Sequence, residues 1–153
     1  MLQGFTAMLN NILMLAYHNI LRVEEEFLQN NNRISLTIRE MHLVECVGEG
    51  DRIGRTISEI ADYLKIARPS VTVAVKKLEH RGYLQKNTCE NDGRVVRVTL
   101  TREGRAIFMY HKRYHLAMVG EIEEELDESE KQLLIGAITK LNKFFEKSIG
   151  AAT

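Results

Sequence analysis

Apolar side chains recur along this chain at two spacings, and each spacing predicts a different kind of element. Spacings of three and four residues predict helices over residues 2–28, 38–47, 57–64, 68–80, 102–125 and 128–149. From Tyr83 the spacing changes to two, which predicts a strand beginning at Leu84 and a second strand from Arg94 to Leu100. Turn residues at Glu90–Gly93 separate the two strands. The predicted fold is mainly α with a small β wing.

Start and stop signals support these boundaries. Thr37–Glu40, Thr56–Glu59 and Asp127–Glu130 have the spacing of capping boxes, in which two side chains bind backbone N–H groups at the start of a helix. Pro69, the only proline, is tolerated in a first helical turn because that position has no helical partner for an N–H. Gly82 supplies the left-handed residue that ends many helices.

The stretch from Thr56 to Thr101 predicts two helices, a tight turn between them and a hairpin, which together make a winged helix-turn-helix. The second helix buries an apolar stripe and leaves a small, polar and basic face that fits a major groove about 12 Å wide. Arg94, at the hairpin tip, is a candidate for a minor-groove contact. The candidate DNA-contacting residues on the helix are Arg68, Ser70, Thr72, Val73, Lys76 and Lys77.

The distribution of charge favours a nucleic-acid partner. The 153 residues have no net charge, but residues 51–105 carry 12 basic and 7 acidic side chains, which gives this segment a charge of +5. Positive charge is therefore concentrated in the predicted winged unit, where DNA would bind. Neither a signal peptide nor a membrane-spanning stretch is predicted, so we expect a cytoplasmic protein with no membrane partner.

Long apolar helices flank the winged unit, which is too small to cover them. We therefore expect one domain over residues 1–153, with the winged unit at about 34–101 and dimerisation helices at about 2–28 and 102–149. In a homodimer, these helices interlock and present two recognition helices to the half-sites of a pseudo-palindromic operator. The expected partners are double-stranded DNA and a second copy of the chain.

Several motifs resemble the MarR family of bacterial transcription regulators. They are Leu36-Thr37, Ser70–Thr72, Leu78–Leu84, Asp92–Arg94 and Leu100–Gly104, which are spread over nearly the whole chain. The resemblance implies a dimeric DNA-binding regulator, most often a repressor, with the wing placed on DNA by Asp92 and Arg94. Gly93 stands where a second arginine is common in the family, and Lys86 replaces a frequent arginine.

An enzyme is not predicted. His111 and His115 have the i, i+4 spacing of zinc proteases, but Lys112 occupies the position of the general-base glutamate in that motif. The sequence has no nucleophile elbow, phosphate-binding glycine loop or paired-carboxylate motif.

Two effectors fit the residues that follow, and no resident cofactor is predicted. Ile38–His42, Val47-Gly48 and His111–Val119 resemble the MarR-type repressors of fatty-acid synthesis genes, which implies an acyl chain carried by acyl carrier protein, or another small hydrophobic ligand. The effector pocket would then include Met41, His42, Phe108, His111, His115 and Met118.

The second effector is zinc. Glu24, His42, His111 and His115 offer one carboxylate and three imidazoles, the kinds of ligand that hold Zn²⁺ tetrahedrally, and the arrangement resembles zinc-sensing members of the family. A third interpretation is that the histidines are structural and bind no ligand.

Overall fold

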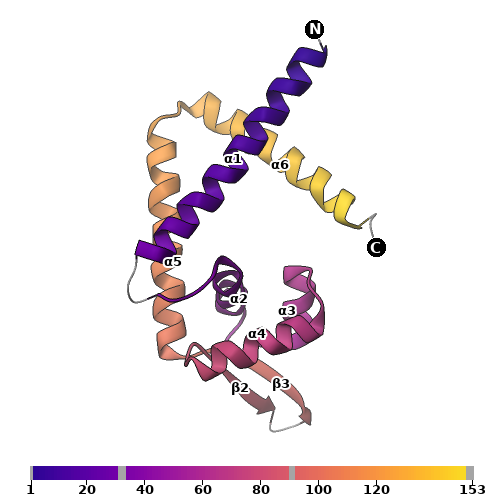
Figure 1. The fold of residues 1–153 in the computed structure, drawn as a ribbon, viewed down its shortest axis with the longest axis vertical. Coiled ribbons are helices and arrows are strands. Elements are labelled where there is room, and N and C mark those ends of the chain that lie inside the picture. The colour runs from indigo at the N-terminus through magenta and orange to yellow at the C-terminus, as the bar shows by residue number, and fades with distance from the viewer. Residues whose placement is uncertain (1, 31–33, 90–91, 151–153) are drawn as a thin grey trace. The chain divides into compact units, whose positions relative to one another are not determined.

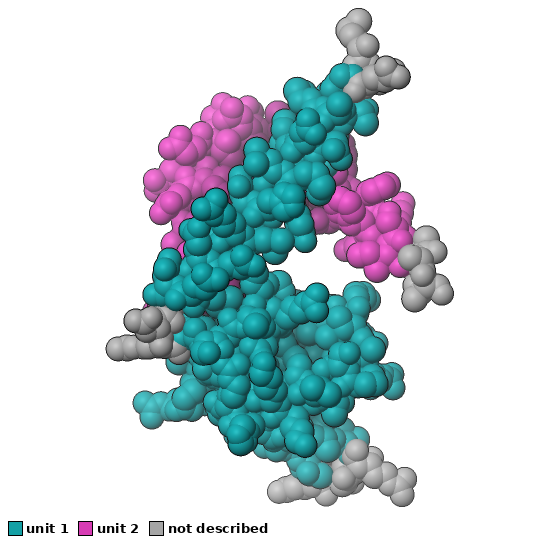
Figure 2. All heavy atoms as spheres, viewed as in Figure 1, with its two compact units in different colours: residues 1–109 teal, residues 110–153 magenta. Residues whose placement is uncertain are grey.

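The structure, a computed structural model, describes residues 2–30, 34–89 and 92–150 (Figure 1). It confirms a mainly helical fold with a small antiparallel sheet. The elements are α1 (Leu2–Asn30), α2 (Ile38–Gly48), β1 (Arg55–Thr56), α3 (Ile57–Leu64), α4 (Arg68–His80), β2 (Leu84–Cys89), β3 (Asp92–Leu100), α5 (Arg102–Glu124) and α6 (Glu128–Gly150). The chain divides into two compact units, residues 1–109 and residues 110–153, coloured teal and magenta in Figure 2.

The predicted helix starts are confirmed at the level of individual hydrogen bonds. The backbone N–H of Glu40 donates to Thr37 Oγ1 over 3.3 Å, and the Thr37 N–H donates to Glu40 Oε2 over 2.9 Å. Thr56 and Glu59 make the same pair of bonds over 3.2 and 2.7 Å. At the start of α6, Glu130 N–H donates to Asp127 Oδ1 over 2.9 Å. The first helix runs two residues beyond the predicted end, to Asn30.

The hairpin differs from the prediction in two details. Its second strand begins at Asp92 rather than Arg94, because Asp92 pairs with Cys89 across the hairpin. A third strand, β1, pairs with β3 at Arg55↔Val98 and Thr56↔Arg97, which gives the strand order β1-β3-β2. The residues at the tip, 90 and 91, lie outside the described part of the chain.

The core of the first unit lies between α2, α3, α4 and the sheet. Buried side chains from these elements include Val44 of α2, Ile60 of α3, Val75 of α4 and Val98 of β3, all without exposed surface. Gly54 has φ +82°, and a Cβ at this position would collide with the carbonyl oxygen of Val98, so the loop can lie against β3 only with glycine there. This core fixes α4 and the wing as one body.

The second unit contains the rest of α5 and all of α6. Large apolar residues of α6 are exposed in the single chain: Leu133 is 73% exposed, Phe144 63% and Phe145 49%. In the first unit, α1 also exposes apolar side chains along its length, among them Phe5, Met8 and Ile12. Within the described residues, no helix is both long and apolar enough to span a membrane.

Candidate nucleic-acid interface

A tight turn joins α3 to α4. Lys65 adopts a left-handed conformation with φ 55° and ψ 42° and ends α3, where the N–H of Ile66 donates to the carbonyl of Ala61 over 3.1 Å. Pro69 lies in the first turn of α4, as predicted. The turn therefore fixes the start of α4 against α3, which is the geometry of a helix-turn-helix.

The two faces of α4 divide as the sequence predicts. Val71, Val75 and Leu78 are fully buried in the core. The six candidate DNA-contacting residues of this helix are all exposed: Arg68, Ser70, Thr72, Val73, Lys76 and Lys77. Because the buried stripe is anchored by the core, the exposed side chains are held on a rigid support.

Within the described residues, two of these six side chains have partners in the protein. The hydroxyl of Thr72 donates to the carbonyl of Arg68, one turn earlier in α4, over 3.0 Å. The Lys77 ammonium nitrogen lies 2.6 Å from Glu40 Oε1 on α2. No sequence pattern predicts the contact between Lys77 and Glu40, since the two residues are 37 positions apart and the capping-box spacing assigns Glu40 only to the start of its own helix.

Glu40 joins α4, the recognition helix of the helix-turn-helix, to α2. Its side chain is 9% exposed, and its second oxygen accepts from Arg81 Nη1 over 3.2 Å. Arg81 also donates to the carbonyl of Ser35 and stacks on the Tyr83 ring, with 5.4 Å between guanidinium carbon and ring centroid. Burial alone would raise the pKa of Glu40. Hydrogen bonds from Lys77 and from the Thr37 backbone lower this pKa, and so do the positive charges of Lys77 and Arg81. Together they hold the pKa of Glu40 below its ordinary value.

The base of the wing is tied to both helices of the motif. Arg97 of β3 donates to the carbonyl of Gly54 over 2.8 Å and lies 3.5 Å from Glu59 of α3. Lys86 of β2 pairs with Glu79 of α4 over 2.8 Å. The backbones of Asp92 and Arg94 belong to β3, but their side chains lie outside the described part of the structure. Their DNA contacts remain a prediction.

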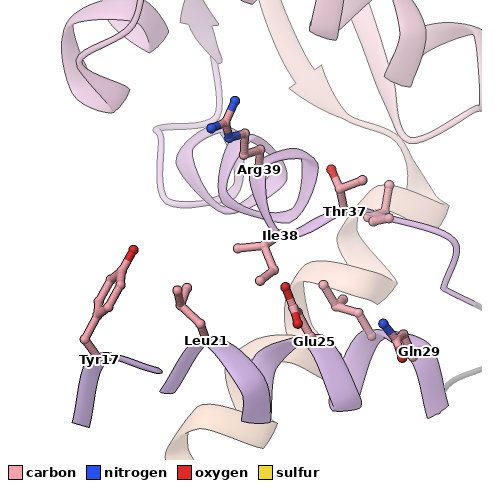
Figure 3. Close-up of a pocket in the computed structure, with 9 residues that line it drawn as sticks. Tyr17, Leu21, Glu25, Gln29, Thr37, Ile38 and Arg39 are labelled. Atoms are coloured by element: carbon pink, nitrogen blue, oxygen red, sulfur yellow. The ribbon is translucent and has the colours of Figure 1, made fainter. Parts of the chain in front are cut away.

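A pocket of about 730 Å³ lies between α1 and the start of α2 (Figure 3). Tyr17, Leu21 and Glu25 point from α1 toward α2, and Ile38 points back toward α1. Its complete lining is Tyr17, Leu21, Glu25, Leu28, Gln29, Leu36, Thr37, Ile38 and Arg39. Its volume lies within the range of small-molecule sites.

This lining contains none of the six residues named from the sequence. Met41 and Phe108 are buried members of the hydrophobic core instead, and an added Cβ on Gly48 would lie 2.7 Å from the Phe108 ring. Periodicity placed these residues on apolar faces correctly, but it does not distinguish a filled core from a cavity wall. Met118 is half-buried in the second unit.

In each of the two units, two of the predicted zinc ligands lie close together. In the first unit, His42 Nε2 lies 3.7 Å from Glu24 Oε2. In the second unit, His111 Nε2 and His115 Nε2 are 3.3 Å apart, a distance that suits either a hydrogen bond or two ligands of one ion. Each pair supplies two ligand atoms of the four in a tetrahedral zinc site, so the donor chemistry fits zinc and the complete site remains a prediction.

The exposed basic α4, its tight turn and the wing beside it define a winged helix-turn-helix DNA-binding protein. The chain belongs to the MarR family, whose sequence model matches residues 36–96. It is similar to FabT of Streptococcus pneumoniae, solved in complex with DNA, with a TM-score of 0.86 and 32% identity over 92% of this chain and 97% of FabT. It is therefore a DNA-binding transcriptional regulator and not an enzyme.

More distant proteins share the fold or part of the sequence. MepR of S. aureus, also solved with DNA, has a TM-score of 0.71 at 18% identity and covers 88% of this chain and 96% of its own. The transcriptional regulator ZitR of Lactococcus lactis is 28% identical over 93 residues, 59% of this chain and 64% of ZitR. The HTH-type regulator YhjH of Bacillus subtilis is 26% identical over 87 residues, 57% of this chain and 49% of YhjH. The matched region thus spans half to two thirds of these two relatives.

Proposed function

We propose that the chain acts as a homodimeric repressor on pseudo-palindromic operators of fatty-acid synthesis genes, and that an acyl chain is its effector. The observation that carries the proposal is the similarity to DNA-bound FabT over almost the whole of both chains. The sequence resemblance at residues 38–42 and 111–119 to MarR-type repressors of fatty-acid synthesis genes supports the pathway. A regulator of this kind acts in the cytoplasm, where the bacterial chromosome lies.

The exposed apolar residues of α1 and α6 support the dimer. Ile12 on α1 and Phe144 on α6 are each more than half exposed, and both have large apolar neighbours one or two helical turns away. Contiguous apolar surface of this kind marks an interface with another protein. A second copy of the chain offers the same surfaces, so a twofold dimer buries both sets at once.

The pocket between α1 and α2 supports an acyl effector. Leu21, Leu28, Leu36 and Ile38 give it apolar walls, while Glu25 and Arg39 add charged groups. Apolar walls with a few polar groups suit a long acyl chain that ends in a polar linkage. Because Thr37 caps α2 and Ile38 and Arg39 begin it, a ligand here would act on the helix that Glu40 joins to the recognition helix.

Zinc is the second candidate effector. The Glu24–His42 and His111–His115 pairs favour it, because a carboxylate and an imidazole lie close together in the first pair and two imidazoles in the second. A zinc effector requires that removal of His42, His111 or His115 each costs most of the metal affinity.

One experiment tests the pathway and both effectors. Genomic DNA fragments bound by the full-length protein are sequenced, and the recovered operator is titrated with protein in the presence of acyl carrier protein loaded with chains from octanoyl to stearoyl. Parallel titrations add Zn²⁺ or a chelator to the same preparation. We expect recovery of promoters of fatty-acid synthesis genes and a change in operator affinity that grows with acyl length, since each buried methylene contributes about 0.8 kcal/mol. A response that is flat with acyl length, together with zinc binding lost in His111→Ala, would favour the metal sensor.

A further inference from the structure

The exposed face of α4 carries an apolar stripe beside its charges. Val73 is 70% exposed, and Ile66, in the turn before the helix, is 45% exposed. Pro69 lies four residues before Val73 and is also exposed. Pro69 and Val73, four positions apart, lie along one side of the N-terminal half of α4, and Ile66 lies in the turn just before it. None of the three belongs to the hydrophobic core of the unit.

Thr72, next to this stripe, presents its polar group to the protein. Its hydroxyl donates a hydrogen bond to the Arg68 carbonyl over 3.0 Å, and this bond competes with any hydrogen bond from the hydroxyl to a base. The methyl group is the part of Thr72 that the helix backbone does not engage. Thr72 therefore adds to the apolar character of the face rather than to its supply of hydrogen-bond donors.

Cations border the stripe and identify its partner as DNA. Arg68 and Lys76 are both exposed, and within the described residues neither forms an ion pair with an acidic side chain. DNA offers phosphates to such cations, and the only apolar group that its base edges display in the major groove is the C5-methyl of thymine. The cations of α4 therefore suit the phosphates of DNA, and its exposed apolar side chains suit the thymine methyl groups in the major groove.

We propose that α4 identifies thymines in the operator through their C5-methyl groups, and that Val73 is the specificity-determining residue. Ile66, Pro69 and the Thr72 methyl extend the same apolar contact. The proposal rests on the operator binding proposed above and adds the chemistry by which bases are distinguished. Removing one methyl group from water corresponds to about a fourfold gain in affinity.

The test uses the full-length protein and operator duplexes enriched from a random-sequence DNA library. Each thymine of a half-site is replaced in turn by deoxyuridine, which lacks the C5-methyl and keeps Watson–Crick pairing. For the unmodified protein, at least one replacement in the half-site should weaken binding about fourfold. Val73→Ala should bind the thymine and uracil duplexes equally at that position, because the side chain that distinguishes them is shortened.

Further variants separate methyl recognition from general DNA affinity. Lys76→Ala should weaken binding to every duplex and retain the uracil effect, as expected for a phosphate contact. Thr72→Ser removes the methyl and keeps the hydroxyl, so it should weaken binding more than Thr72→Val, which does the opposite. The reverse order would show that the hydroxyl reads a base and would overturn the role given to Thr72.

Three outcomes distinguish failure of this inference from failure of the proposed function. Binding to an enriched operator that ignores uracil at every position, or full uracil sensitivity in Val73→Ala, would overturn methyl recognition and leave operator binding intact. A library in which no sequence is enriched would overturn sequence-specific operator binding, and methyl recognition with it.

Discussion

Lys77 of the recognition helix and Glu40 of α2 form an ion pair with 2.6 Å between Nζ and Oε1. The pair matters because Glu40 directly follows Thr37, Ile38 and Arg39, which line the pocket. Glu40 also caps the start of α2 through the Thr37 backbone and binds Arg81 at the end of α4. One nearly buried carboxylate thus connects the pocket wall to the C-terminal end of the DNA-facing helix.

Glu40→Gln should destabilise the protein by about 1–3 kcal/mol, because it leaves Lys77 and Arg81 without their anionic partner at a nearly buried site. Urea unfolding measures the change. The matched control is Glu79→Gln, whose partner Lys86 lies at a more exposed site, and its cost should stay below about 1 kcal/mol. Equal costs for the two variants would show that Glu40 has no special structural role.

The contribution of Glu40 should depend on pH in a defined direction. Its pKa in the folded protein lies below the ordinary value of 4.5, so folding favours the ionised form. The stabilisation is therefore fully present above about pH 4.5 and is lost as the pH falls through the folded pKa. The difference in unfolding free energy between the unmodified protein and Glu40→Gln should be constant near neutral pH and shrink below about pH 4.5. Glu59 and Glu79 also have lowered pKa values, but both are present in the two proteins, so their contributions cancel in the difference.

Local signals predicted the helix starts and the two faces of α4. Capping boxes at Thr37 and Thr56 act over three residues, and the buried stripe of α4 follows from a 3.6-residue period, so both can be found without tertiary structure. Strand β1 could not be found in this way, since two residues carry no period. It forms because Arg55 and Thr56 pair with β3 along the edge that faces away from β2.

The site was predicted less completely than the fold. The exposed residues of α4 were identified, but the engagement of Thr72 by its own helix and of Lys77 by Glu40 depends on side-chain geometry. The pocket lining depends on how α1 packs on α2, which periodicity does not specify. Residues such as Met41, which the sequence assigned to the pocket, fill the core instead.

Phe145→Glu should convert the proposed dimer to a monomer and abolish tight binding to an operator with two half-sites, because a charge would replace a large apolar side chain in the interface. Light scattering measures the mass, and a DNA titration measures affinity. Asn142→Glu, an exposed polar position on the same helix, introduces the same charge and should preserve more of both properties. A monomeric unmodified protein that still binds the operator tightly would contradict the dimer.

Arg94→Ala should weaken binding to all DNA sequences alike, since a cation at the wing tip interacts with phosphates and the groove potential rather than with one base. The slope of log affinity against log salt concentration should fall in magnitude by about one unit. Asn87→Ala, a neutral wing position bonded to Thr99, is the matched control and should leave the slope unchanged. Unchanged affinity and slope in Arg94→Ala would show that the wing tip does not touch DNA.

Leu21→Trp should remove the response to an acyl effector, because the larger side chain fills the pocket. Operator binding should remain, because Leu21 belongs to α1 and is distant in sequence from α4. The measurement is the operator titration with long-chain acyl carrier protein, which should shift affinity for the unmodified protein and not for the variant. Arg22→Trp, whose position is exposed and outside the lining, controls for the size of the new side chain and should keep the response. Loss of operator binding in Leu21→Trp without ligand would mean that filling the pocket itself moves α2, and through Glu40 the recognition helix. A full acyl response in Leu21→Trp would place the effector elsewhere and leave the zinc titration as the next discriminating experiment.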